Sequence, residues 1–175
     1  TVIVGGTTAD TSVYANGFFP KAIEIGVGDT ITWQFEGFHN VAFLSGAPEL
    51  QFAVPDANKK EFYWNPQILS PAGGQAYDGT GFHNSGTPNQ PSFSYTLTFT
   101  KPGRYTYECS IHSGMRGVVI VKDKATGTPA AALKQGRAEQ AAAVAAGAAR
   151  LASLKPERHG DTVVLPLWGN SAQRY

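Results

Sequence analysis

The stretch Tyr105-Thr-Tyr-Glu-Cys-Ser-Ile-His-Ser-Gly-Met-Arg-Gly117 decides how the rest of this 175-residue chain is understood. It contains the only cysteine and the only methionine of the chain, together with one of its four histidines. Cys109, His112 and Met115 are spaced three residues apart, between an aromatic, strand-like segment and the apolar run Val118–Val121. The loop between these two segments therefore carries a thiol, an imidazole and a thioether within seven residues.

These side chains are sulfur and nitrogen donors that suit soft and borderline metal ions. Two histidines and one cysteine in a trigonal set, with a long axial methionine, form the blue-copper arrangement. The loop lacks one histidine, and His39 is predicted to supply it. His39 lies in Phe35-Glu-Gly-Phe-His-Asn-Val-Ala-Phe43, between two strand-like segments. A β-sandwich brings distant strands side by side, so His39 and the loop can meet at one end of it.

Residues 1 to 123 carry the pattern of short strands, in which apolar and polar residues alternate and Gly, Pro or Asp separates the runs. The predicted strands are 1–4, 22–27, 30–35, 41–44, 94–99, 104–109 and 117–121. The fold class that this pattern predicts is all-β, an antiparallel β-sandwich with Greek-key connections. Residues 46–91 lack such a pattern, and we expect a short strand or helical turn there. The aromatic residues of this segment are expected to cover one edge of the sandwich.

The composition changes after Asp123, where alanine dominates as far as Leu154. Thr128 and Pro129 predict the N-cap and first turn of a helix, and Pro156 ends it. Residues 124–156 are therefore interpreted as an Ala-rich helical linker or appendage. The helix carries only a thin apolar stripe on one face, and two glycines lower its stability. We therefore expect weak docking of the helix on the sandwich. The stripe is Val144, Ala148, Leu151 and Leu154, and the glycines are Gly136 and Gly147.

Residues 157–175 form a strand-like tail. Its segment Thr162–Leu165 resembles Thr1–Val4 at the start of the chain. Two interpretations stay open, because the tail is either an added strand of the first domain or the beginning of a second domain. The absence of a recognisable signal peptide is taken as a mature or trimmed start.

Composition excludes several classes of function. The net charge is +1 and only 15% of the residues are charged, which argues against nucleic-acid binding. No apolar run is long enough to predict a membrane span. A single cysteine excludes an internal disulfide framework.

The two segments that contain the candidate ligands resemble those of small blue copper proteins, the cupredoxins. They are Gly37-Phe-His-Asn-Val41 and the run Gly103–Val121. The overall similarity is nearest the plastocyanin-like group, and the short spacing from cysteine to methionine is that of amicyanin. The resemblance implies one type 1 copper ion. Its implied ligands are His39, Cys109 and His112 in the plane and Met115 on the axis.

The same resemblance assigns further roles around the metal. Asn40 is expected to tie the two ligand loops together by hydrogen bonds to Ser110, and Tyr105 to pin a strand-connecting corner. Redox partners are expected to dock transiently around the edge of His112, on a patch formed by Phe38, Ile111 and Gly114. An extracytoplasmic location, periplasmic or secreted, is also implied. The long interval from His39 to Cys109 and the C-terminal helix depart from the small members of the family.

The expected function is a one-electron carrier and not an enzyme. The alternative is a copper-binding module of a larger protein or redox complex, tethered by the C-terminal helix. His83 repeats the Phe-His-Asn triplet of His39, but its Gly- and Pro-rich surroundings predict a polar loop residue. Oxidase or nitrite-reductase chemistry needs more histidines than the chain has. A nucleophilic Cys109 or a zinc site fits Met115 and the strand context less well.

Overall fold

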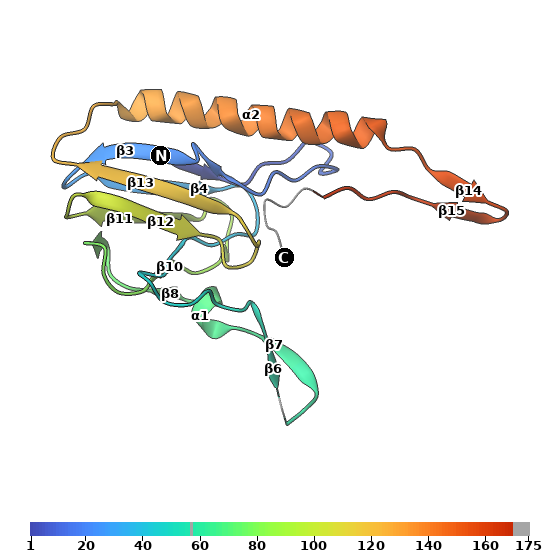
Figure 1. The fold of residues 1–175 in the computed structure, drawn as a ribbon, viewed down its shortest axis with the longest axis horizontal. Coiled ribbons are helices and arrows are strands. Elements are labelled where there is room, and N and C mark those ends of the chain that lie inside the picture. The colour runs from blue at the N-terminus through green and yellow to red at the C-terminus, as the bar shows by residue number, and fades with distance from the viewer. Residues whose placement is uncertain (57, 170–175) are drawn as a thin grey trace.

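The computed structural model describes residues 1–56 and 58–169. Two sheets face each other in a β-sandwich, and a long helix runs alongside it (Figure 1). One sheet has the order β2-β1-β4-β11-β9 and the other β3-β13-β12-β5-β10-β8. The first sheet contains β1 (Val2–Val4), β2 (Phe18–Phe19), β4 (Thr30–Phe35), β9 (Ala76–Tyr77) and β11 (Ser94–Phe99). The second contains β3 (Ala22–Gly26), β5 (Ala42–Phe43), β8 (Pro71–Ala72), β10 (His83–Ser85), β12 (Gly103–Glu108) and β13 (Arg116–Lys122).

The predicted sandwich is confirmed, but its sheets are mixed and not purely antiparallel. Strand β1 pairs parallel with β4, β13 with β3, and β11 with β9. Strands that follow each other in the sequence, such as β3 and β4, lie in different sheets. Neighbours within a sheet are therefore often joined by crossovers, which permit parallel pairing. All seven predicted strands are present, two with the predicted bounds and five with ends shifted by one residue.

The core lies between the two sheets and is rich in aromatic side chains. Trp33 is fully buried and contacts the rings of Phe43 and Tyr107 edge-on. Tyr105 packs at the rim, and its hydroxyl donates to the carbonyl oxygens of Lys101 and Pro102. That contact is the corner predicted for Tyr105. The core extends to one end of the sandwich, where Cys109 and Met115 belong to it.

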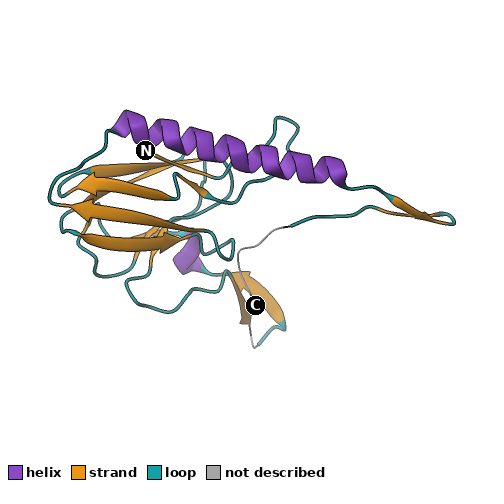
Figure 2. Cartoon of the chain, turned by 45° about the horizontal axis from the view of Figure 1, so that its top comes forward, coloured by secondary structure: helices purple, strands orange, loops and turns teal. Residues whose placement is uncertain are grey.

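Residues 46–91 contain more structure than their sequence pattern indicates. They form a hairpin of β6 (Ala53–Asp56) and β7 (Glu61–Trp64), helix α1 (Pro66–Leu69), and strands β8, β9 and β10. The expectation that the aromatic residues cover an edge of the sandwich is wrong for the hairpin. Strand β6 pairs only with β7, and the two project from the sandwich (Figure 2). Phe62, Tyr63 and Trp64 are therefore exposed, whereas Tyr77 is in the core.

The C-terminal helix is α2 (Pro129–Ser153), close to the predicted bounds. The Thr128 hydroxyl accepts a hydrogen bond from the backbone N–H of Ala131, as expected of an N-cap. A small exposed hairpin follows, made of β14 (Glu157–His159) and β15 (Thr162–Val164), and it pairs with neither sheet of the sandwich. Residues 170–175 of the predicted tail lie outside the described residues. No helix in the described part of the chain is long and apolar enough to cross a membrane.

The contact between α2 and the sandwich differs from the expectation of a thin apolar stripe. Strands β1 and β2 contact the helix, and Ala132 of the helix packs against the hydrophobic core. A Cβ atom on Gly136 would lie 2.5 Å from the Phe19 carbonyl oxygen. The two glycines that weaken the isolated helix are therefore points of close approach, because Gly147 likewise meets the Val13 side chain. Gln140 is buried in the same contact.

Candidate metal centre

The loop after β12 is short and internally bonded. The Met115 N–H donates to the His112 carbonyl oxygen at 3.1 Å, and the Cys109 N–H donates to the Met115 carbonyl oxygen at 2.9 Å. Gly114 has a φ of 79°, in the left-handed region where glycine is favoured. The turn therefore returns the chain directly into β13, with Cys109 and Met115 opposite each other.

Three of the four predicted ligands come together at this end of the sandwich. His39 Nδ1 lies 3.1 Å from His112 Nδ1, and the Cys109 sulfur lies 3.6 Å from His112 Nδ1 and 3.9 Å from His39 Nδ1. One donor atom from each of the three residues fits within 4.8 Å of the others. Among the described residues this is the one such group of three or more His, Cys, Asp or Glu side chains.

Met115 occupies the same buried end. Its side chain is 4% exposed and belongs to the core cluster that contains Cys109. The hydrogen bond between the Cys109 N–H and the Met115 carbonyl fixes the backbone of these two residues next to each other. The thioether of Met115 thus lies in the same buried cluster as the Cys109 thiol.

Burial controls the charge of the site in the metal-free protein. His39 is 3% exposed, and burial followed by the nearby His112 lowers its pKa to about 4. Burial also lowers the pKa of His112, which is half-buried. Burial raises the pKa of the Cys109 thiol, partly opposed by the backbone N–H groups of Asn40, His112 and Ile111. The imidazoles are therefore held neutral near pH 7, which is the form that binds a metal ion.

Two glycines lie against the His39 ring. A Cβ atom on Gly5 would lie 2.5 Å from His39 Nε2, and one on Gly37 would lie 2.8 Å from it. Both glycines have positive φ angles, 84° and 149°. The imidazole thus presents Nδ1 to Cys109 and His112, while its other nitrogen faces backbone that no side chain can occupy.

Asn40 joins the two ligand loops as predicted. Its Oδ1 accepts a 2.7 Å hydrogen bond from the Ser110 N–H. Asn40 directly follows His39 and Ser110 directly follows Cys109, so the bond joins the neighbours of two candidate ligands. Its Nδ2 lies 3.5 Å from the Ser110 hydroxyl. Asn40 is fully buried, so these bonds are shielded from water.

Asn84 extends this network, and the sequence interpretation missed it. Asn40 Nδ2 donates to Asn84 Oδ1 at 2.9 Å. Asn84 Nδ2 in turn donates to the carbonyl oxygens of Gln67, Ile68 and Ser70. The signal was present in the sequence, because the repeated Phe-His-Asn triplet places these two asparagines in corresponding positions.

His83 is separate from the metal cluster. It lies on β10 and is 9% exposed, so the prediction of a polar loop residue is wrong. Its ring contacts Tyr77 edge-on and rests on Gly73, and Nε2 lies 3.2 Å from the Ala76 carbonyl oxygen. The His83 ring is therefore packed among residues of β9 and of the turn that follows β8.

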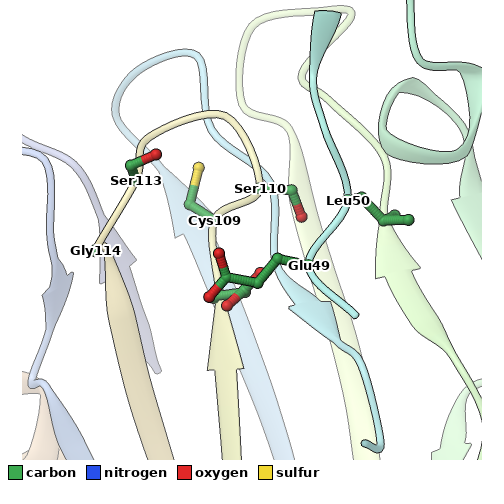
Figure 3. A pocket seen from close by; sticks show the side chains of 7 residues that line it. Glu49, Leu50, Cys109, Ser110, Ser113 and Gly114 are labelled. Atoms are coloured by element: carbon green, nitrogen blue, oxygen red, sulfur yellow. The ribbon is translucent and has the colours of Figure 1, made fainter. Parts of the chain in front are cut away.

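The surface around the loop has few unpaired charges. Glu49 and Glu108 both pair with Arg116. A small hollow beside Cys109 lies between the segment containing Glu49 and Leu50 and the loop containing Ser113 and Gly114 (Figure 3). In Figure 3 the Cys109 sulfur points toward the loop and away from the Glu49 carboxylate.

The residues predicted for docking border this end of the molecule. Phe38 is 51% exposed, and Ile111 and Gly114 are half-buried. Phe38 also contacts Phe52 edge-on, and Phe52 stacks on the exposed Trp64 of β7. The apolar surface beside the site therefore continues onto the β6–β7 hairpin.

A sandwich whose two loops meet in a buried cysteine–histidine cluster is typical of copper proteins that have one mononuclear site. Comparison with known proteins agrees, since residues 8–122 match the model for copper binding proteins of the plastocyanin/azurin family. The chain belongs to that family, and copper is its cofactor. The donor set of two imidazoles and a buried thiol fits a type 1 site.

Individual relatives cover part of the chain. It is 30% identical over 111 residues to the chloroplastic plastocyanin of Physcomitrium patens, a match that covers 61% of this chain and 51% of the relative. The chain thus spans about half the length of that curated relative. A structure of an amicyanin variant in its Cu(I) form is 24% identical, and the match covers 58% of this chain and 70% of the other with a TM-score of 0.34. An oxidised amicyanin variant is 25% identical, with the same coverage and TM-score.

Proposed function

We propose that this protein is a one-electron carrier with a single type 1 copper site, held by His39, Cys109 and His112 with Met115 as the axial ligand. The observation that carries the proposal is the convergence of the thiol and both Nδ1 atoms. Copper supplies the exchange between its Cu(I) and Cu(II) states. Because the sandwich holds the donors together before the metal binds, little rearrangement is needed between these states.

Each side chain has a distinct task in this proposal. Cys109 and His39 are buried and fix the position of the metal inside the protein. His112 is the half-buried ligand, so its ring edge is the route by which an electron leaves or enters. The low charge and apolar surface of Phe38, Ile111 and Gly114 suit transient docking of redox proteins. Asn40 and Ser110 orient the ligand loops.

Catalysis is not part of the proposal. The other two histidines lie elsewhere, since His83 belongs to the core of the second sheet and His159 is on the exposed β14. We further propose an extracytoplasmic location, periplasmic or secreted, on the family relationship.

The experiment is titration of the metal-free protein with Cu(II), followed by visible absorption and voltammetry. An intense blue or green band that is absent from Cys109→Ser and altered in His112→Gln supports the proposal. His159→Gln serves as the matched control, because this histidine is on the exposed hairpin, and it should leave the band unchanged. A colourless copper complex of the unaltered protein would refute the proposal.

A second function is favoured by one observation, the exposed apolar residues after α2. Val163, Val164 and Leu165 are 44%, 47% and 69% exposed. Such a surface fits a copper-binding module of a larger redox complex that assembles by contact of this tail with a second copy of the chain. Light scattering of the full chain and of a Val164→Asp, Leu165→Asp variant tests it. A monomer in both cases, with no change in retention, argues against self-association through the tail.

A further inference from the structure

The helix that the sequence presents as a linker reaches the strand ends from which the His39 loop departs. Gln140 lies in the middle of α2 and is 8% exposed. Its Nε2 donates to the Gly5 carbonyl oxygen at 2.9 Å and to the Glu36 carboxylate at 2.6 Å. Gly5 directly follows β1, and Glu36 directly follows β4, three residues before His39.

A second helix residue reinforces this contact. Arg137 donates to the other oxygen of the Glu36 carboxylate at 2.6 Å. It also donates to Gln140 Oε1 at 3.0 Å, which orients the carboxamide so that its nitrogen faces Gly5. The carboxylate of Glu36 is thus bound at both oxygens by one helix.

Of the two residues that Gln140 holds, Gly5 lies against the His39 ring, and Glu36 directly precedes Gly37, the other glycine against that ring. The Gly5 α-carbon approaches so closely that an added Cβ would lie 2.5 Å from His39 Nε2 and 2.7 Å from the Glu36 carbonyl oxygen. The Glu36 N–H donates to the Val4 carbonyl oxygen, and the Gly5 N–H to that of Gly17. The backbone against the imidazole is therefore fixed by strand bonds on one side and by Gln140 on the other.

We propose that Gln140 is a positioning residue for His39, acting through Gly5 and Glu36, and that α2 is a working part of the copper domain and not a tether. The inference rests on the proposed copper site. Partners that orient metal ligands are worth about 10- to 100-fold in metal affinity. Because Gln140 acts through backbone next to the ring, we expect an effect at the lower end of that range.

The test compares Gln140→Leu with Gln135→Leu in the full-length protein. Gln135 is on the exposed face of the same helix and bonds only to Glu139, in the next turn. Leucine and glutamine have similar helix propensities, so both variants keep the helix. For Gln140→Leu we expect about a tenfold rise in the copper Kd, a shifted reduction potential and an altered visible band. Gln135→Leu should match the unaltered protein in all three.

Hydrogen exchange of the metal-free protein gives a readout that does not depend on copper. The amides of Gly5 and Glu36 should exchange several-fold faster in Gln140→Leu, and amides of β12 and β13 should be unchanged. Unchanged exchange at Gly5 and Glu36 together with an unchanged spectrum and Kd would overturn the inference. Absence of colour in the unaltered protein would instead contradict the proposed copper site, and the exchange comparison would still decide the role of Gln140. If Gln140→Leu does not fold, Gln140→Asn, which keeps the amide on a shorter side chain, is measured in its place.

Discussion

The Asn40 carboxamide donates a 2.9 Å hydrogen bond to Oδ1 of Asn84, and both side chains are fully buried. This bond joins the loop of His39 to the segment 46–91, which family resemblance alone does not explain. Asn84 completes the connection by donating to three carbonyl oxygens around α1. The segment 46–91 is therefore hydrogen-bonded through Asn84 to the residue that follows His39.

Replacing Asn84 should lower stability strongly. Asn84→Ala leaves Asn40 Nδ2 without its 2.9 Å acceptor and the buried Ile68 carbonyl, together with the part-buried carbonyls of Gln67 and Ser70, without a donor. Each group left unpaired in the interior costs about 1–3 kcal/mol. We expect a loss of about 3 kcal/mol in the free energy of unfolding, measured by urea denaturation. Asn89→Ala, at an exposed position, is the control and should change stability by less than about 0.5 kcal/mol. Equal stability of the two variants would contradict a structural role for Asn84.

The metal-free protein should become less stable as the pH falls from about 6.5 to 4. The pKa of His39 is about 4 in the fold against 6.5 ordinarily, so in this interval the unfolded chain binds a proton that the folded chain does not. This shift in the pKa of His39 corresponds to a loss of about 3 kcal/mol in the free energy of unfolding. The loss levels off below pH 4. Unfolding by urea at several pH values measures it. The slope should diminish in His39→Gln, and a flat profile for the unaltered protein would show that burial does not hold His39 neutral.

Gly136→Ala should destabilise the protein although alanine is the better helix former. The intrinsic gain of about 1 kcal/mol is outweighed because the new Cβ would lie 2.5 Å from the backbone oxygen of Phe19. We expect a net loss of about 1–3 kcal/mol, as for other overpacked sites. Gly147→Ala is the comparison. Its Cβ meets only the Val13 side chain, which can turn away, so its effect should be close to zero. A more stable Gly136→Ala protein would mean that the helix does not dock here.

Met115→Gln should keep the copper but lower the reduction potential. The amide oxygen is a harder donor than the thioether and favours Cu(II) over Cu(I). A tenfold change in the ratio of the two affinities equals about 59 mV for a one-electron couple, and we expect a decrease of at least that size by voltammetry. Met115→Leu, which removes the donor without adding oxygen, should not lower the potential. Equal potentials in all three proteins would show that Met115 is not a ligand.

Electron self-exchange between the Cu(I) and Cu(II) forms should depend on the aromatic surface beside the site. Phe38→Ser and Trp64→Ser remove exposed rings from the apolar face and should slow self-exchange several-fold, with reduction by a small molecule unchanged. Tyr14→Ser removes a ring that is 65% exposed in the loop after β1, away from the site, and is the control. Equal slowing by all three variants would place docking elsewhere.

Sequence patterns predicted those features that depend on local spacing. Cys109, His112 and Met115 belong to one loop, and the alternating strands determine where it lies, so the ligand end of the sandwich was predictable. His39 was predictable because it lies between two recognisable strands and one histidine was missing from the loop. Segment 46–91 was not, since its strands are only two to four residues long and so leave no periodicity in the sequence.

The helix shows the opposite difficulty. The existence of the helix follows from the helix propensity of alanine and from its N-cap. Its docking depends on Gly136 and Gln140, and a glycine and a polar residue at these positions weaken the amphipathic pattern in the sequence. Close approach of two backbones requires a small residue on one side, and that requirement is visible only when both partners are known. Composition therefore indicated a linker where the structure has a packed element.

The two glycines beside His39 also determine how the metal arrives. Gly5 and Gly37 close the inner side of that ring, and Cys109 and Met115 are both nearly inaccessible. His112 is the one ligand of the proposed set with appreciable exposure. In the proposed carrier, copper would therefore enter across the surface around His112 that we propose for electron exchange. A copper donor and a redox partner would then compete for the surface around His112. Copper binding would therefore have to be complete before the protein could transfer electrons.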